Sequence, residues 1–145
     1  MKNFLQKKLK NEKGLTLVEL LAVIVILGII AAIAIPAIGN IIDNSRVKAA
    51  KADAQNIISA GNMYFTENPD EVDVEVEISK LKSEGFLESE GSLTNTGKVK
   101  KVKDTGVHFT GTTNEKIKPK VTFTNATSKD ITDSGKKTEV TNATP

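Results

Sequence analysis

The chain has 145 residues, a formal net charge of +2, no cysteine and only six aromatic side chains. This length leaves room for one small domain besides a long apolar segment. Without cysteine there is no disulfide framework, no thiol nucleophile and no thiolate metal site. Nor does the sequence pair a nucleophile with a base or carry a phosphate-binding glycine loop. We therefore expect no enzyme, no metal site and no cofactor.

The charge is unevenly distributed along the chain. Residues 1–14 carry five lysines against Glu12 alone, a net +4, which leaves −2 on the remaining residues. Lysine and arginine next to a membrane-spanning segment are held on the cytoplasmic side. The basic segment therefore predicts an N-terminus inside the cell and a C-terminal part outside.

A long apolar run follows the basic segment. Residues 20–39 contain no charged or polar side chain, and twenty helical residues span about 30 Å, the thickness of a bilayer's hydrocarbon core. Gly28 and the alanines near it are small enough to let neighbouring helices approach closely. Pro36 cannot donate a main-chain hydrogen bond, so it predicts a kink in this helix.

These features together resemble the N-terminus of type IV pilins and pseudopilins. The resemblance lies in a lysine-rich leader ending at Gly14, the string Leu15-Thr16-Leu17-Val18-Glu19, the apolar run and Pro36. It implies that prepilin peptidase cuts between Gly14 and Leu15 and methylates the new N-terminus at Leu15. It also implies a role in filament assembly for Glu19. Leu15 departs from the phenylalanine that is commoner at the first position.

The resemblance further implies a structural subunit of a type IV pilus or pilus-like filament. Its partners would be copies of itself in a helical homopolymer, minor pilins, an assembly ATPase and a membrane platform protein. The subunit would be stored in the cytoplasmic membrane and then join a filament at the cell surface. An adhesion or motility pilus, a competence pseudopilin for DNA uptake and a type II secretion-like pseudopilin all remain open.

Two other interpretations of the N-terminus are an ordinary signal peptide and an uncleaved signal anchor. Ala32-Ile33-Ala34 offers a small-x-small cleavage site, which would release a secreted domain. The apolar run is longer than a usual signal peptide's, and Pro36 would lie two residues after the cut. Neither alternative explains the positions of Gly14 and Glu19, so we favour the pilin-like interpretation over a secreted or membrane-anchored surface domain.

The predicted organisation is a leader over residues 1–14, a transmembrane and filament-core helix over 15–42, and a globular domain over 43–145. Within this domain the helix continues over 43–67, because apolar residues recur at three- and four-residue spacing. It should end before Pro69, since a residue preceding proline avoids the α region. The apolar stripe comprises Val47, Ala50, Ala54, Ile57, Ile58, Gly61, Tyr64 and Phe65.

A connecting region over residues 68–97 comes next. Alternation in the string EVDVEVEI, residues 71–78, predicts an extended strand with all four apolar residues facing inward. Ser79 is predicted to cap a short helix over 80–84, which Gly85 ends. This helix and turn also resemble an element that follows the long helix in pseudopilins.

Residues 98–145 are predicted to form a β-sheet and a polar tail. Strands are expected at 99–103, 107–110 and 117–124. The polar tail from residue 125 either adds a last strand near 138–141 or remains mobile. Pro119 should place its part of the third strand at an edge or a bulge. The fold class is α+β, pilin-like, with the long helix packed on a small antiparallel sheet.

Several polar residues in this part are candidates for sites. His108, the one histidine, is predicted to lie on the outer face of its strand. Asp130, Asp133 and Glu139 are a weak candidate for calcium because their spacing lacks a loop pattern. Asn125-Ala126-Thr127 and Asn142-Ala143-Thr144 match the glycosylation pattern but are short enough to occur by chance.

Two groups of lysines raise the question of DNA binding. They comprise Lys98, Lys100, Lys101 and Lys103, and then Lys116, Lys118 and Lys120. No arginine or aromatic residue is interleaved with them, so the pattern favours a solvated face over DNA as a partner. The sharper hypothesis is that the lysines meet an acidic row within or between subunits. This acidic row consists of Glu71, Asp73, Glu75 and Glu77.

Overall fold

The computed structural model describes the backbone of residues 2–142 and the side chains of residues 16–142. Its packing divides the chain into two units, Met1–Ile41 and Ile42–Pro145. One helix, α1 (Lys2–Glu67), provides all the described structure of the first unit and the first element of the second. It continues through Pro36 without a break in the assignment. The kink expected at this proline stays a prediction.

In the second unit, α1 ends at Glu67 as predicted. The main-chain N–H and the side-chain Nδ2 of Asn68 both donate to the carbonyl oxygen of Tyr64, at 2.9 and 3.0 Å. These bonds satisfy a carbonyl that the end of the helix would leave unpaired. The predicted apolar stripe is buried along this part of the helix, at Val47, Ala50, Ala54, Ile57, Ile58, Gly61, Tyr64 and Phe65.

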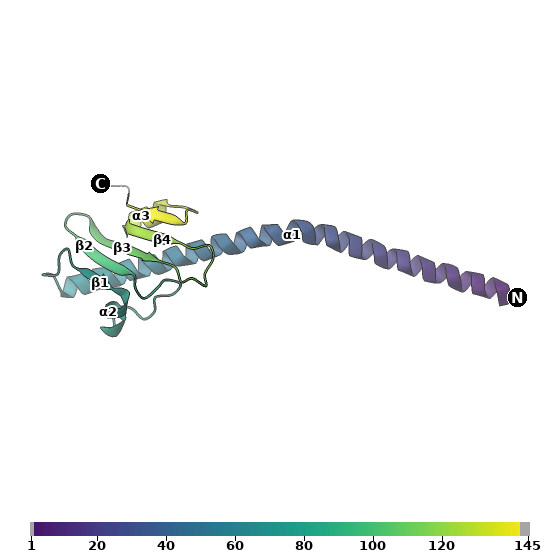
Figure 1. The fold of residues 1–145 in the computed structure, drawn as a ribbon, viewed down its shortest axis with the longest axis horizontal. Helices are drawn as coiled ribbons and strands as arrows, with labels where there is room; N and C mark the ends of the chain where they lie inside the picture. The colour runs from purple at the N-terminus through teal and green to yellow at the C-terminus, as the bar shows by residue number, and fades with distance from the viewer. Residues whose placement is uncertain (1, 143–145) are drawn as a thin grey trace. The chain divides into compact units, whose positions relative to one another are not determined.

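Five strands form one sheet in the order β1-β2-β3-β4-β5, beside the C-terminal part of α1 (Figure 1). The first four strands, β1 (Glu75–Glu77), β2 (Lys98–Val102), β3 (Gly106–Thr112) and β4 (Thr122–Ala126), pair antiparallel. The last, β5 (Glu139–Thr141), pairs parallel with β4. The predicted α+β fold is therefore confirmed, and the all-antiparallel sheet is wrong at its last strand.

The parallel pairing follows from a helix that the sequence analysis missed, α3 (Ser128–Asp133), between β4 and β5. A crossover of this kind returns the chain to the same end of the sheet. Thr127 caps α3: its side chain accepts from the N–H of Asp130, and Asp130 accepts from Thr127 in return. The signal was present as a Thr followed three residues later by an acid.

The connecting region differs from the predicted long strand. Val72 and Val74 are 41% and 44% exposed, and β1 covers only three residues. The interruption lies at Asp73, whose φ of +62° is left-handed and whose N–H donates to the carbonyl oxygen of Lys101 at 2.9 Å. A left-handed residue breaks the two-residue alternation of a strand, so only Val76 and Ile78 face the core.

The short helix α2 (Ile78–Ser83) begins earlier than predicted, after Glu77, and no side chain caps it. Ser79 Oγ instead donates to the carboxylate of Glu77 at 3.0 Å. Gly85 ends this helix, as expected, with φ +82°.

The predicted strand over residues 117–124 is wrong in its first half. Residues 114–121 form a loop that contains a cis peptide bond at Lys118-Pro119, and β4 begins only at Thr122. The loop nevertheless keeps an alternation of exposure: Lys116, Lys118 and Lys120 are exposed, and Val121 is fully buried.

The core lies between the buried stripe of α1 and the inner face of the sheet. A Cβ added to Gly61 would lie 3.1 Å from Cγ1 of Val107 and 3.2 Å from Cγ2 of Val99. The missing side chain therefore lets α1 approach the sheet closely. Beyond this contact the rings of Phe109 and Phe123 pack with centroids 5.4 Å apart.

Two glycines with positive φ allow a test of how much a loop's contact with α1 contributes to stability. Gly91 (φ +62°) would place a Cβ 2.4 Å from Cγ of Asp53, a carboxylate that accepts from Ser92, whereas Gly85 (φ +82°) has open space. We expect Gly85→Ala to cost about 1–2 kcal/mol from backbone strain alone. Gly91→Ala should cost roughly 1.5–3 kcal/mol more, because Asp53 must leave Ser92.

The measurement is urea unfolding of the detergent-solubilised chain, followed by the fluorescence of Tyr64. This residue is the one tyrosine of a chain without tryptophan. Equal losses for the two variants would show that the Asp53 contact contributes nothing to the stability of the second unit.

Candidate functional site

The apolar part of α1 in the first unit presents its large side chains outward. Within residues 16–41, Ile33 is 72% exposed and Leu17 is 67% exposed. The most apolar 18-residue window of the helix has a mean hydropathy of 3.0, and none of it is buried. Among the described residues this is the one helix long and apolar enough to cross a membrane. So large an apolar surface marks a site that lipid or protein covers.

Glu19 lies at the N-terminal end of this surface and is exposed. It forms no ion pair with any other residue in the range 16–142, and the next charged residue along the chain is Asp43. Gly14 and Leu15 lie in α1 by their backbone, and their side chains fall outside the described ones. A helix rises about 1.5 Å per residue, so Glu19 follows Leu15 by about 6 Å along the axis.

The second unit is tied to α1 by polar side chains on both flanks of the buried stripe. Three donate to the segments after β3: Arg46 Nη1 to Lys118 O (3.1 Å), Lys51 Nζ to Gly135 O (2.9 Å) and Gln55 Nε2 to Thr132 Oγ1 (3.0 Å). On another segment, Ser92 donates from N and Oγ to Asp53 Oδ2, at 2.8 and 2.6 Å. The helix thus carries a bond for each long connection between strands.

Lys51 is the most buried of these groups, with 7% of its surface exposed. Desolvation, and then the neighbouring positive charge of Lys137, lower the pKa of Lys51. The hydrogen bond to Gly135 O gives the buried ammonium group one acceptor in place of water. This tie therefore serves to hold the segment after α3 against the helix.

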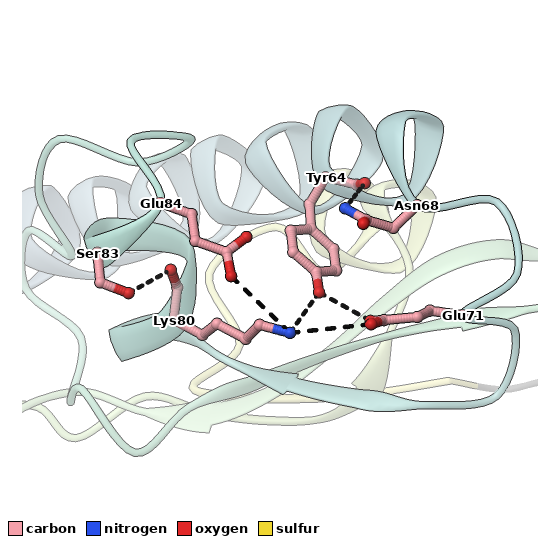
Figure 2. A network of polar contacts seen from close by, with 6 residues as sticks. All are labelled: Tyr64, Asn68, Glu71, Lys80, Ser83 and Glu84. Carbon is pink, nitrogen blue, oxygen red and sulfur yellow. Dashed lines mark hydrogen bonds and ion pairs between the residues drawn. The ribbon is translucent and has the colours of Figure 1, made fainter.

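A polar network closes the C-terminal end of α1 (Figure 2). Tyr64, buried on the last turns of the helix, donates from its hydroxyl to Glu71 Oε2 at 2.8 Å. Lys80 of α2 donates to the same hydroxyl at 2.5 Å and lies within 3.9 Å of Glu71 and Glu84. The Tyr64 ring packs edge-on against Phe86, at 5.5 Å between centroids. One side chain thus joins the helix, the following loop and α2.

The network sets the protonation of its members. The hydrogen bond to Tyr64 and the charge of Glu71 raise the pKa of Lys80. The hydrogen bond from Lys80 acts to lower the pKa of Tyr64, but burial and Glu71 outweigh it, and the net shift is upward. Both groups therefore keep their protons near neutral pH, as the direction of the hydrogen bonds requires.

The predicted meeting of lysines with the acidic row is confirmed within the chain, but at β2 and not at the later lysines. Lys98 Nζ lies 2.9 Å from Glu75 Oε2, and Lys100 Nζ lies 3.5 Å from Asp73 Oδ1. The hydrogen bond from Lys98 lowers the pKa of Glu75. Both pairs are diagonal to the β1 and β2 register, in which Glu75 lies opposite Lys100. They engage two of the seven lysines that raise the question of DNA binding.

The prediction that His108 lies on the surface is wrong, because only 3% of it is exposed. It does lie between the inward-facing Val107 and Phe109, but Asn125 covers it. His108 Nδ1 is 3.1 Å from both the carbonyl oxygen and Oδ1 of Asn125, and Nε2 is 2.8 Å from Thr105 Oγ1. Asn125 has a left-handed φ of +50° where it contacts His108, and no local pattern in the sequence predicts this conformation.

The three candidate calcium ligands, Asp130, Asp133 and Glu139, line one groove of about 780 Å³ between α1, α3 and β5, but they do not converge. Asp130 is engaged in the cap of α3, where hydrogen bonds from Thr127 outweigh desolvation and lower its pKa. Asp133 pairs with Lys129 at 3.4 Å. Within the described part of the chain, no three His, Cys, Asp or Glu side chains are placed to hold a metal ion.

The contribution of the Tyr64 network can be measured with a conservative change. Tyr64→Phe keeps the ring but removes an acceptor for Lys80 and a donor to Glu71, so we expect a loss of about 1–2 kcal/mol. Thr66→Val is the control, because it removes an exposed hydroxyl that bonds only within α1, and it should change stability by less than about 0.5 kcal/mol. Urea unfolding followed by circular dichroism measures both, and equal stability of the two variants would contradict the assigned role.

Comparison with known proteins places a motif on the N-terminal part of the chain. A family model described as the prokaryotic N-terminal methylation motif matches residues 9–35. This range contains Gly14, Leu15 and Glu19. Type II secretion system core protein G of Pseudomonas aeruginosa is 39% identical over 59 residues. The alignment covers 41% of this chain and 42% of that protein, less than half of each.

No solved structure matches the chain. Two independent observations bear on the family. The methylation motif lies on the exposed apolar helix, and the sheet packs on the continuation of that helix. The chain carries a prepilin-type N-terminal methylation motif at the start of a pilin-like α+β fold, and this combination shows its resemblance to pilins and pseudopilins.

Proposed function

We propose that this chain is a structural subunit of a type IV pilus or a related pilus-like filament. The observation that carries the proposal is one helix with two kinds of surface. Its N-terminal part bears the methylation motif and an apolar surface of which none is buried, and its C-terminal part belongs to a folded α+β unit. In this proposal residues 1–14 are the leader, residues 15–42 form the membrane and filament-core helix, and residues 43–145 form the outer domain.

Processing prepares the helix for assembly. Prepilin peptidase cuts after Gly14 and methylates Leu15, which leaves Glu19 in the second turn of the new helix. A negative charge near a helix N-terminus is favourable. Before assembly the helix spans the cytoplasmic membrane once, with its N-terminus inside, as the basic leader favours.

Assembly moves the helix from lipid into a bundle of identical helices. A carboxylate removed from water among apolar side chains costs several kcal/mol unless it is compensated. In the filament, the compensating group for Glu19 is the positive N-terminal amine of Leu15 in a neighbouring subunit. This pairing sets the axial register of each incoming subunit. Apolar surface is covered before and after the transfer, so an assembly ATPase with its platform protein must supply direction.

The relative named as a type II secretion protein favours a second candidate within the same class, a secretion pseudopilin. A competence pseudopilin and an adhesion or motility pilus share the same N-terminal chemistry. The identity of the neighbouring genes, a DNA-uptake system or a secretion system, distinguishes these filament types. Minor pilins would be further partners in each case.

The first test is the N-terminal sequence and mass of the chain recovered from cells that contain prepilin peptidase. We expect a start at Leu15 with one added methyl group. Gly14→Val should block the cut because the residue before the scissile bond gains a branched side chain. Gly28→Val is the control, since a Cβ there meets nothing within 4 Å, and it should be processed normally. A wild-type start at Ile35 would indicate a secreted domain, and an intact Met1 would indicate a signal anchor; both outcomes refute the proposal.

The second test separates processing from assembly. Glu19→Gln keeps size and hydrogen bonding but removes the charge, so the chain should still be cut while the yield of sheared filaments falls tenfold or more. Glu88→Gln makes the same change at an exposed position of the second unit and should leave the yield unchanged. Filaments of Glu19→Gln at wild-type yield would remove the charge pairing from the assembly mechanism.

A further inference from the structure

The loop of residues 114–121, here called the basic loop, carries charge that nothing in the described chain neutralises. Lys116, Lys118 and Lys120 are exposed, and none forms an ion pair with another residue of the range 16–142. Two lysines of β2, Lys98 and Lys100, pair with Glu75 and Asp73 of the acidic row. Glu115 is the one acid within the loop, so its net charge is positive.

The basic loop is fixed beside the first turns of the second unit. Arg46 Nη1 donates to the carbonyl oxygen of Lys118 at 3.1 Å, so the loop's main chain is held on α1 at that residue. Arg46 and Lys48 are themselves exposed on these turns. Asp43 lies 3.7 Å from Arg46 and offsets one of these charges. The region as a whole, with Glu115 included, remains cationic.

This position corresponds to the depth of lipid headgroups. The proposed membrane helix ends at Ile42, and Arg46 follows it by four residues, which is about 6 Å of helix. Headgroups occupy roughly 5–7 Å on each side of the hydrocarbon core. Because the two units are covalently joined at Ile41 and Ile42, the first turn of the second unit lies at this boundary whenever the run is in lipid.

We propose that the basic loop binds the phosphate groups of anionic lipids on the outer surface of the membrane before the subunit is assembled. This inference rests on the proposed function, since it requires the apolar run to span the membrane. The lysines reach the headgroups as flexible point charges, and the main-chain bond from Arg46 keeps the loop in place. Extraction of the subunit into a filament must then break these contacts, so they retain the subunit in the membrane until the motor acts.

The test uses the full chain in vesicles, with a probe on the loop. Because the chain has no cysteine, Glu115→Cys provides a single labelling site for an environment-sensitive fluorophore. Probe emission is compared in vesicles of phosphatidylcholine alone and in vesicles with 30% phosphatidylglycerol, at low salt and at 0.5 M NaCl. We expect a blue shift only with the anionic lipid, and its loss at high salt, where charges are screened within a few ångströms.

Two charge variants made in this background identify the lysines. Each lysine near an anionic surface favours contact about fivefold, so Lys118→Gln with Lys120→Gln should lower the ratio of bound to free loop roughly 25-fold. The matched control, Lys101→Gln with Lys103→Gln, removes the same charge from β2 and the turn after it and should keep the blue shift. A shift unaffected by lipid charge or by the first pair overturns the inference. A blue shift that increases with the amount of protein per vesicle also overturns the inference, because the loop would then contact the acidic surface of a second copy.

Failure of this inference and failure of the proposed function give different results. Resistance to alkaline extraction is measured on the same vesicles, and cleavage after Gly14 is measured after prepilin peptidase is added to them. An inserted and processed chain whose probe ignores lipid charge refutes lipid binding alone. A chain that is neither inserted nor processed refutes the proposed function, and the lipid contact with it.

Discussion

The packing of α1 against the sheet is the contact on which the rest of the second unit depends. The two meet where Gly61 faces Val99 and Val107, and a side chain at this glycine would lie within 3.3 Å of both valines. The sheet has few aromatic residues to bury, so its stability relies on this close approach and on a continuous apolar stripe. A helix held along one face in this way keeps its other flanks available for polar ties to the loops.

Those ties explain how long connections remain ordered in so small a unit. Four side chains of the helix bind the three long connections between strands, and three of them bind main-chain groups of the partner. They are Arg46, Lys51, Asp53 and Gln55, of which Lys51 and Gln55 share the connection between β4 and β5. A main-chain partner holds a loop whatever its side chains are. The basic loop therefore presents its lysines outward while its backbone stays fixed. The Tyr64 network holds the segment after the helix through side chains instead, those of Glu71 and Lys80.

The first unit follows a different physical rule. Its helix has no partner within the described chain, and its apolar side chains are exposed around the axis. Such a surface is stable only in lipid or against other apolar helices. Glu19 is the one carboxylate at the edge of this surface. The free-energy cost of its charge depends on whether water, lipid or a positive group surrounds it. This is why the N-terminal motif and the exposed helix support one proposal.

The sequence by itself determined the features that rest on local periodicity and local stereochemistry. These were the apolar run, the buried stripe, the end of α1 before Pro69, the turn at Gly85 and the presence of a methylation motif around Glu19. Only the tertiary structure decided which lysines meet the acidic row, the burial of His108 under Asn125 and the parallel pairing of β5. The reason is that these depend on left-handed residues and on contacts between segments far apart in the chain, and neither leaves a periodic trace in the sequence.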